Sequence, residues 1–275
     1  MSQPTALLIG GTRNLGPDLA AALLQAGFHL TILNRGITQG PPLDPQIERL
    51  YADRSNEPAL TAALSNRDFD VVIDTTLYTG PDAQAAARIF ANRTARYVML
   101  STGQVYLVRT GLTRPFVEST YEGPLMPAPP AANTFDFNNW SYGIHKRNAE
   151  DALRASSIPL TVLRLPMINS ERDHYFRLRN YLTRVADGGP ILIPAEQPQL
   201  PLRHVYGPDV VRAVMRAIET NTSGAFNIGQ DDTWTIDQFL THIGATPARI
   251  PTQTLWSHGL MPQCSPFSEP WISSL

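Results

Sequence analysis

The feature that most constrains the fold is a regular alternation, in the first half of the chain, of two kinds of segment. Short runs rich in β-branched and aliphatic residues, typical of buried strands, occupy residues 5–9, 28–33, 47–51, 70–73 and 96–100. Between them, residues 15–26, 58–64 and 81–91 are rich in Ala and Leu and place apolar residues near the helical period. Strands joined by crossover helices predict an α/β fold with a doubly wound parallel sheet, whose ligand crevice lies at the carboxyl ends of the strands.

The second half is less regular. Residues 108–139 are rich in proline and predict a long irregular loop, which in a compact domain is typical of a lid over a site. Helices are predicted over 142–155, 177–186, 208–219 and from 235, and strands over 160–165, 191–193 and 225–228, whereas the tail from 246 shows no clear terminal element. We therefore expect a Rossmann-like domain over residues 1–165, to which 204–229 returns, and a smaller substrate-binding region over 166–275.

Composition and charge exclude several classes of function. The 275 residues are 43% apolar and 17% charged, which favours an ordinary globular protein. The net charge of -2 and the absence of basic runs argue against a nucleic-acid partner. Cys264 is the only cysteine, and the sequence contains no Cys/His cluster for a metal. Because it also lacks a signal peptide and a membrane-length apolar run, we expect a cytoplasmic protein without metal or membrane partners.

A glycine-rich loop follows the first predicted strand directly and precedes the first helix. Gly10 permits a tight turn, Gly16 permits close packing of helix on strand, and the helix N-terminus offers N–H groups to a pyrophosphate. This position in a βαβ series indicates a dinucleotide site rather than a simple turn. The candidate cofactor-binding residues of the loop are Gly10, Thr12, Arg13, Asn14, Leu15 and Gly16.

The end of the second strand indicates which dinucleotide is bound. An acidic residue that would hold the adenosine ribose of NAD is absent there, and Asn34 and Arg35 occupy the place. Arg35, helped by Arg13, could pair with a 2′-phosphate, so the sequence predicts that NADP(H) is preferred over NAD(H). Further candidate cofactor-binding residues, with fewer arguments behind them, are Asp53, Arg54 and Thr75.

The basic residues of the chain are all arginine except Lys146, which stands four residues after Tyr142. On a helix these two side chains share a face, and a cation beside a tyrosine lowers the pKa of the phenol. The fifth strand delivers hydroxyls of Ser101 and Thr102 at its carboxyl end, where they could bind a substrate oxygen while Tyr142 transfers a proton. Such a set predicts an oxidoreductase that interconverts a secondary alcohol and a ketone.

Together these motifs resemble the extended short-chain dehydrogenase/reductase family, the NAD(P)-dependent epimerase/dehydratase group. The resemblance covers about residues 5–243 and includes the segments 163–166, 203–205, 209–210 and 224–229. It implies that Thr102, Tyr142 and Lys146 are catalytic, that Lys146 also anchors the cofactor ribose, and that Pro166 flanks the nicotinamide. By analogy with the family, we also expect a homodimer.

The substrate is less constrained. The resemblance implies a nucleotide-sugar-like molecule, a secondary metabolite is an alternative, and the candidate substrate residues are Gln104, Tyr106 and Arg203. The segment 113–138 could shape a less polar pocket around Phe116. Family dehydratases carry an Asp-Glu pair where this chain has Gly103 and Gln104, which disfavours a sugar dehydratase but leaves reductase and epimerase both open. A non-catalytic NADP-binding regulator or an RNA-binding relative is the alternative of another class.

Overall fold

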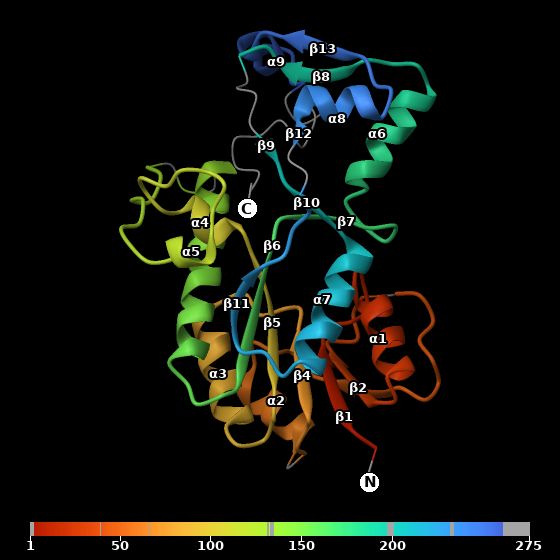
Figure 1. Cartoon of the computed structure of the whole chain (residues 1–275), viewed down its shortest axis with the longest axis vertical. Helices are drawn as coiled ribbons and strands as arrows, with labels where there is room; N and C mark the ends of the chain where they lie inside the picture. The colour runs from red at the N-terminus through yellow and green to blue at the C-terminus, as the bar shows by residue number, and fades with distance from the viewer. Residues whose placement is uncertain are drawn as a thin grey trace.

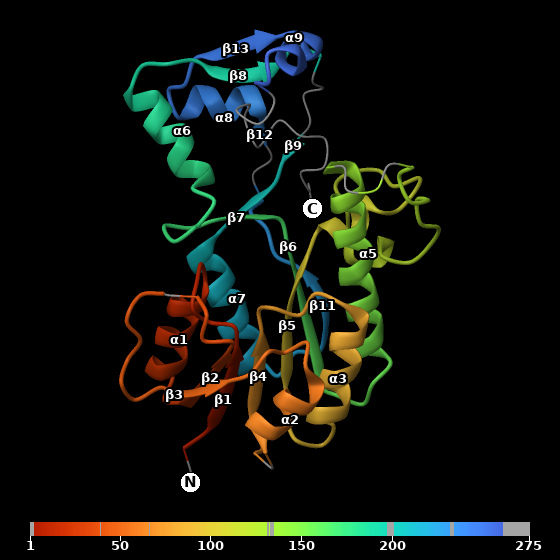
Figure 2. The same ribbon diagram turned by 180° about the vertical axis from the view of Figure 1, so that it is seen from behind.

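The computed structural model describes residues 3–38, 40–65, 67–130, 132, 135–196, 201–231 and 234–260. The chain forms a larger body around a central sheet and a smaller upper lobe, and the two are joined by several passages of the backbone (Figure 1). Figure 2, the view from behind, shows helices on both sides of the sheet. The N-terminal end lies at the foot of the body, far from the upper lobe.

The central sheet has seven strands in the order β11-β6-β5-β4-β1-β2-β3, and every pair is parallel. Its strands are β1 (Thr5–Ile9), β2 (His29–Asn34), β3 (Glu48–Tyr51), β4 (Val71–Asp74), β5 (Tyr97–Thr102), β6 (Leu160–Leu165) and β11 (Gly224–Asn227). The order runs outward from β1 in both directions, so the crossover reverses between β1 and β4. This confirms the predicted α/β fold, and such a reversal opens a ligand crevice at the carboxyl ends of the strands.

Both faces of the sheet are covered by helices. One face carries α1 (Gly16–Gln25) and α7 (Gly207–Glu219), and the other carries α2 (Glu57–Leu64), α3 (Gly80–Phe90) and α5 (Phe135–Arg154). Successive strand side chains point to opposite faces, so Leu7 packs in the core under α2, α3 and α5 while Leu8 packs in the core under α1 and α7. Because both faces are buried, the central strands β1 and β4 are almost continuously apolar, whereas the edge strand β3 carries Glu48 and Arg49.

The upper lobe has a core of its own. It contains α6 (Arg177–Ala186), β8 (Ile191–Pro194), α8 (Ile236–His242), β13 (Pro247–Ile250) and α9 (Thr252–Ser257). β8 pairs with β13 in parallel, and Tyr181, Ile193 and Leu240 are buried between these elements. Short ladders join the lobe to the body: β7 (Met167–Asn169) pairs with β10 (His204–Tyr206), and β9 (Pro201–Leu202) pairs with β12 (Trp234–Thr235).

The structure corrects the sequence analysis in three places. The helix predicted from 142 begins at Phe135. In the tail from 246, for which no clear terminal element is predicted, residues up to 260 form β13 and α9, because β13 finds its partner β8 more than fifty residues away in the chain, and the end of the tail, 261–275, lies outside the described residues. The proline-rich loop does not form a lid: Met126 N–H donates to the Val108 carbonyl (2.8 Å), and the indole N–H of Trp140 donates to the Met126 carbonyl (3.1 Å).

These bonds hold the loop against α4 (Gln104–Leu107) and α5, and it also contains η1 (Glu118–Thr120). Phe116 is buried against the ring of Tyr106, with 5.4 Å between the ring centroids, instead of lining a substrate pocket. Within the described residues, no helix combines the length and the apolar composition that crossing a membrane requires. The division of the chain near residue 165 stays a prediction, although β11 and α7 both belong to the larger body.

Candidate active site

At two positions, the glycine loop has the left-handed backbone conformation that favours glycine. Gly10 and Gly11 have φ angles of 99° and 79°. A Cβ atom on Gly16 would lie 2.3 Å from the backbone carbonyl carbon of Gly11, so the start of α1 packs directly on the loop. No side chain caps the N-terminus of α1, although the Gly16 N–H donates to the Arg13 carbonyl (2.9 Å) and Pro17 has no N–H, so it is the positive end of the helix dipole that faces a phosphate here.

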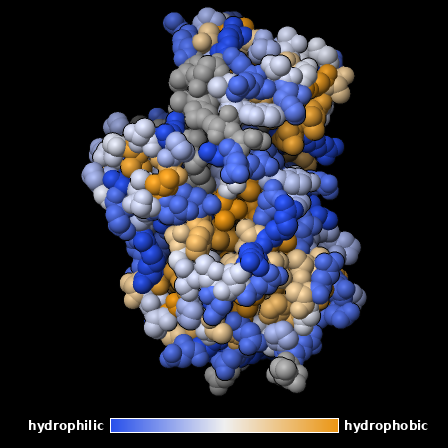
Figure 3. All heavy atoms as spheres, viewed as in Figure 1, coloured by the Kyte–Doolittle hydropathy of each residue, from blue (hydrophilic) through white to orange (hydrophobic). Residues whose placement is uncertain are grey.

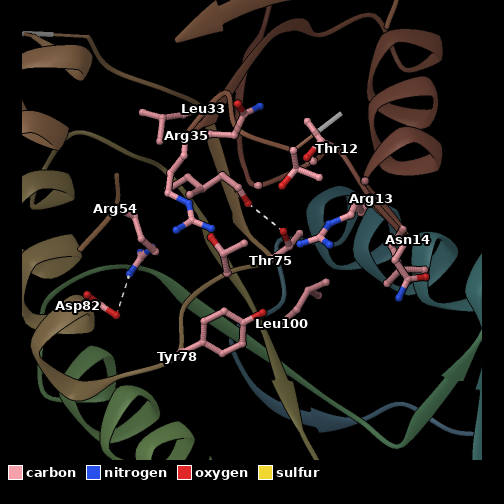
Figure 4. Close-up of a pocket in the computed structure, with 18 of the residues that line it drawn as sticks. Thr12, Arg13, Asn14, Leu33, Arg35, Arg54, Thr75, Tyr78, Asp82 and Leu100 are labelled. Atoms are coloured by element: carbon pink, nitrogen blue, oxygen red, sulfur yellow. Dashed lines mark hydrogen bonds and ion pairs between the residues drawn. The ribbon is translucent and has the colours of Figure 1, made fainter. Parts of the chain in front are cut away.

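A cavity of about 530 Å³ lies between this loop, the carboxyl ends of the neighbouring strands and α5 (Figure 4). Its walls bring together nearly all of the residues that the sequence predicts for the cofactor, and both members of the Tyr-x-x-x-Lys pair. The predicted residues that line it are Gly10, Thr12, Arg13, Asn14, Leu15, Gly16, Asn34, Arg35, Asp53, Arg54, Thr75, Tyr142 and Lys146. The cavity therefore extends from the loop in two directions. One end, which we call the adenosine end, lies at Asn34 and Arg35, and the other, which we call the reaction end, lies at Tyr142 and Lys146.

Other predicted residues lie elsewhere. Tyr106 is fully buried, accepts a hydrogen bond from Arg164 (2.7 Å) and donates one to Asn227 (2.8 Å), so its hydroxyl cannot meet a substrate. Gln104 is buried beside it in α4, where its side-chain amide donates to the Asn139 carbonyl. The sequence pattern could not show that the chain turns into a short buried helix directly after β5.

Two further predicted residues flank the cavity without lining it. Arg203 lies between β9 and β10 and donates to the backbone carbonyl of Gln230. Pro166 follows β6 and is buried, while its neighbours Leu165 and Ile168 reach the cavity wall. The structure therefore places neither Arg203 nor Pro166 in the cavity.

Two hydroxyl groups lie close to each other beside the reaction end. Thr102, at the end of β5, lies close enough to the phenol of Tyr142, on α5, to lower its pKa, but Thr102 is not among the residues that line the cavity, and its hydroxyl accepts a hydrogen bond from the Gln104 N–H (3.2 Å). The side chain of Ser101 is turned away, since its hydroxyl donates to the buried carboxylate of Glu150 (2.5 Å). Of the two candidate hydroxyls, only that of Thr102 affects the pKa of Tyr142.

The electrostatics of Tyr142 differ from the sequence-based expectation. The side chain of Tyr142 is 39% exposed at the cavity, yet the loss of solvent around its hydroxyl, with a smaller contribution from the neighbouring Tyr78, raises its pKa to about 12, and Thr102 offsets only part of this. The ammonium of Lys146 does not contact the phenol. It donates instead to the backbone carbonyls of Leu77 and Leu100, at 2.8 Å each. The expected lowering of the Tyr142 pKa by Lys146 is therefore wrong for this state of the protein.

Lys146 is itself perturbed by its surroundings. It is 3% exposed, and burial lowers its pKa to about 8, although the nearby acids Asp74 and Glu150 oppose this shift. Tyr142, Lys146 and Glu150 are spaced by four residues and form one stripe of α5. The stripe places a phenol at the surface of the cavity, an ammonium below it and a carboxylate in the core.

The opposite end of the cavity is rich in hydrogen-bond donors. Asn34 accepts a hydrogen bond from the Gly36 N–H (2.8 Å), and its buried Nδ2 has no partner among the described residues. Arg35 is exposed, with its guanidinium 4.0 Å from Asp53. Arg54 is buried against Asp74, and its Nε also has no partner within the described part of the chain. Unpaired buried donors fit a ligand that offers acceptors, as a ribose phosphate does.

Sequence reasoning missed several residues of the wall. Tyr78 and Asp82 come from the segment after β4, and His174 comes from the segment before α6. No spacing or motif marks these positions. They reach the cavity because the topology brings the carboxyl ends of β4 and β6 to the same edge of the sheet.

A doubly wound parallel sheet, a glycine loop packed on an uncapped helix and a cavity along the strand ends define a dinucleotide-binding α/β protein. The model of the family described as NAD(P)H-binding matches residues 10–189, so the chain belongs to this NAD(P)H-binding family. This match supports the expected resemblance to the extended short-chain dehydrogenase/reductase group and the binding of a nicotinamide dinucleotide.

Comparisons with individual proteins agree with this assignment. The chain is 29% identical to 2′-dehydrokanamycin reductase of Streptomyces kanamyceticus over 151 residues, which are 54% of this chain and 38% of that protein. The chain thus matches well under half of the length of this relative.

Solved structures share the fold at low sequence identity. The Bordetella bronchiseptica enzyme WbmG in complex with NAD has a TM-score of 0.71 at 15% identity, over 99% of this chain and 92% of that one. UDP-glucose 4-epimerase of Thermotoga maritima, with UDP-glucose, has a TM-score of 0.68 at 18% identity, over 90% of this chain and 85% of that one. These likenesses cover both the body and the upper lobe.

Proposed function

We propose that the protein is an NADP-dependent oxidoreductase that interconverts a secondary alcohol and a ketone. The observation that carries the proposal is that Tyr142 and Lys146, one helical turn apart on α5, both line one end of the dinucleotide cavity, with Thr102 near the phenol. The name of the Streptomyces relative as a reductase, and those of the structural neighbours as epimerases, support the same class of chemistry. A bound nicotinamide would supply or accept the hydride.

Each residue has a definite task in this proposal. With a pKa of about 12, Tyr142 is protonated at neutral pH, and it can donate its proton to a ketone oxygen during reduction. Thr102, which lies near the phenol, would offer a second hydroxyl to the same oxygen. Lys146 would bind the cofactor ribose with its compact ammonium. The same three residues serve a reductase and an epimerase.

The preference for NADP rests on Arg35, Arg13 and Asn34. Arg35 is exposed at the adenosine end, and the unpaired Nδ2 of Asn34 lies beside it in the cavity wall. Replacing Arg35 by Ala should weaken the binding of NADPH by about tenfold and leave that of NADH nearly unchanged, because only NADPH carries the 2′-phosphate. Titration of nicotinamide fluorescence measures both affinities. Arg49→Ala, on the neighbouring strand β3, is the control for a general loss of positive charge.

The substrate that we propose is a small molecule, either nucleotide-sugar-like or a secondary metabolite. The homodimer, the cytoplasmic location and the absence of a nucleic-acid partner stay predictions.

The activity is tested by incubating the protein with NADPH and a panel of cyclic and open-chain ketones while the cofactor absorbance is followed. Tyr142→Phe should lower kcat at least about a hundredfold, because it removes the proton donor. Tyr206→Phe makes the same chemical change at an exposed residue at the end of β10 and should leave kcat unchanged. Full turnover by Tyr142→Phe would refute the proposed role.

A further inference from the structure

The ring of Tyr78 lies against the ammonium of Lys146 at the reaction end. The Nζ atom of Lys146 lies over the ring face, 5.3 Å from its centroid. The same ammonium donates to the carbonyl of Leu77, the residue directly before Tyr78, and to that of Leu100, at 2.8 Å each. Figure 4 shows the Tyr78 ring and Leu100 at the same end of the cavity. The segment after β4 therefore contacts the ammonium twice, once through a carbonyl and once through a ring face.

The backbone that carries Tyr78 is held on both sides. The Thr76 N–H donates to the carboxylate of Asp74 (2.9 Å), and the side chain of Thr79 caps the N-terminus of α3 by accepting from a backbone N–H. Leu77 is fully buried in the core under α3 and α5. The fold thus fixes the position from which the ring reaches the ammonium.

Little solvent reaches the ammonium. Lys146 is 3% exposed, and the apolar side chains of Leu100, Leu165 and Ile168 also line the cavity. Figure 3 shows further apolar side chains on the surface between the body and the upper lobe. A cation–π contact is stronger where the cation is desolvated, so the ring face contributes more here than it would at an exposed site.

The charge of Lys146 is not balanced by an ion pair within the described part of the chain. Asp74 on β4 and Glu150 on α5 favour the charged form. Both acids already have another partner, since Asp74 pairs with Arg54, and Glu150 pairs with Arg164 at 2.7 Å. Arg54, which follows β3, disfavours the charge of Lys146. The ammonium therefore depends on neutral groups in direct contact with it, which are two carbonyls and a ring face.

A further titratable group beside the ring is Tyr142, whose ring centroid lies 6.5 Å from that of Tyr78. With a pKa of about 12, the phenol of Tyr142 carries no charge at neutral pH, so it supplies no counterion. The ring face of Tyr78 is thus left to supplement the two carbonyls in stabilising the ammonium.

We propose that Tyr78 is a positioning residue, whose ring face keeps the Lys146 ammonium charged and seated on its two backbone carbonyls. The assignment deepens the proposed function, on which its effect on activity rests, by naming a residue outside the set of Thr102, Tyr142 and Lys146. Tyr78 transfers neither a proton nor a hydride. Its ring instead sets the highest pH at which the ammonium persists.

The first test measures the charge of Lys146 directly and needs no activity. Lys146 is the only lysine of the chain, so protein labelled with ¹³C at the lysine Cε gives a single lysine signal in its carbon NMR spectrum. Without NADPH, the pH titration of that signal should have its midpoint at about 8 in the unmodified protein. Tyr78→Leu keeps an apolar side chain but removes the ring face. Because the contact favours the charged form, its loss should shift the midpoint down by about one pH unit.

Two variants are controls for this shift. Tyr78→Phe keeps the ring face, so its midpoint should equal that of the unmodified protein. Tyr206→Leu removes a tyrosine ring that is 43% exposed outside the cavity wall, and it should also leave the midpoint unchanged. An unchanged or raised midpoint in Tyr78→Leu, or an equal fall in Tyr78→Phe, would overturn the proposal. If the melting temperature shows that Tyr78→Leu does not fold, Tyr78→Met replaces it, with the same expected shift.

The second test follows activity with NADPH. The pH above which kcat/KM for ketone reduction falls should move down by about one unit in Tyr78→Leu and stay in place in Tyr78→Phe. A limit that does not move, although the NMR midpoint does, would contradict the proposed effect of the ring on activity. If the midpoint shifts as expected but the unmodified protein reduces no ketone, the proposed function fails, whereas the stabilisation of the Lys146 charge by Tyr78 stands.

Discussion

At the scale of the residue, Lys146 is the most constrained side chain of the candidate site. Its ammonium fits between two backbone carbonyls on neighbouring strand ends, and it is almost fully buried. A guanidinium is planar and broader, so it cannot occupy the same point. Lys146→Arg, which keeps the charge, should therefore lower the rate of NADPH oxidation more than about tenfold. Arg212→Lys, on an exposed turn of α7, is the control, and a Lys146→Arg enzyme with normal activity would contradict this view of the site.

The two perturbed pKa values predict a pH profile. The ammonium of Lys146 loses its charge as the pH rises through about 8, whereas Tyr142 keeps its proton up to about 12. The value of kcat/KM for ketone reduction reports the groups of the free enzyme, so it should fall above pH 8, by about tenfold per pH unit. Initial rates at subsaturating ketone, measured over this range, provide the check. A profile that stays level up to about pH 10 would show that the charge of Lys146 is not required.

The place of a single residue in the site could be predicted where the residues that it contacts in space are also close to it in the sequence. The loop glycines and the pair of Tyr142 and Lys146 could be predicted because a strand, a turn and a helix fix their relative positions within a few residues. Tyr78 could not, because no local pattern shows that the end of β4 meets α5. The pKa of Tyr142 is raised mainly by burial and in smaller part by Tyr78, and neither effect can be read from the local spacing of Tyr142 and Lys146.

At the scale of the element, α5 is held in register by a buried ion pair. Arg164 on β6 makes a two-pronged contact with Glu150, at 3.1 Å from Nε and 2.7 Å from Nη2, and Ser101 on β5 donates to the same carboxylate. The pair ties the helix that carries Tyr142 and Lys146 to both central strands. Glu150 thus positions the proposed catalytic residues without contacting the cavity.

Breaking this pair should be costly. Arg164→Leu leaves the Glu150 charge buried without a counterion, and it should lower the free energy of unfolding by about 3 to 5 kcal/mol. Removing both charges together, with Glu150→Met in addition, should recover much of this loss. Arg184→Leu breaks the exposed pair with Asp187 and should cost about 1 kcal/mol or less. Urea denaturation compares the variants, and equal costs for Arg164→Leu and Arg184→Leu would refute the role of the pair.

Elements could be predicted well where they are long and periodic. The strand over Leu160–Leu165 and the helix over Arg177–Ala186 have the predicted bounds, because apolar spacing alone defines them. Ladders of two or three residues, such as β7 with β10, leave no period to detect, and they form only because tertiary structure aligns the two segments. For the same reason, the sequence does not predict β13, whose partner β8 lies far away in the chain.

At the scale of the whole molecule, the wall of the cavity is built both by the body and by the segment that leads to the upper lobe. The body supplies the glycine loop, the strand ends and α5, while the segment between β7 and α6, at the approach to the upper lobe, supplies His174. Alternation of strands and helices was sufficient to predict the body. The same alternation could not predict which segment of the second half of the chain reaches the cavity. That depends on where the backbone passes between the body and the upper lobe.

The pairing of distant strands also sets the order in which the molecule can be completed as it is synthesised. β8 emerges early from the ribosome but pairs only with β13, more than fifty residues later. The sheet of the body likewise waits for its edge strand β11, which follows the first half of the upper lobe in the chain. Neither part can be finished as an independent unit during translation, so a nascent chain stalled before residue 224 exposes the unpaired edge of β6 and half of the lobe core.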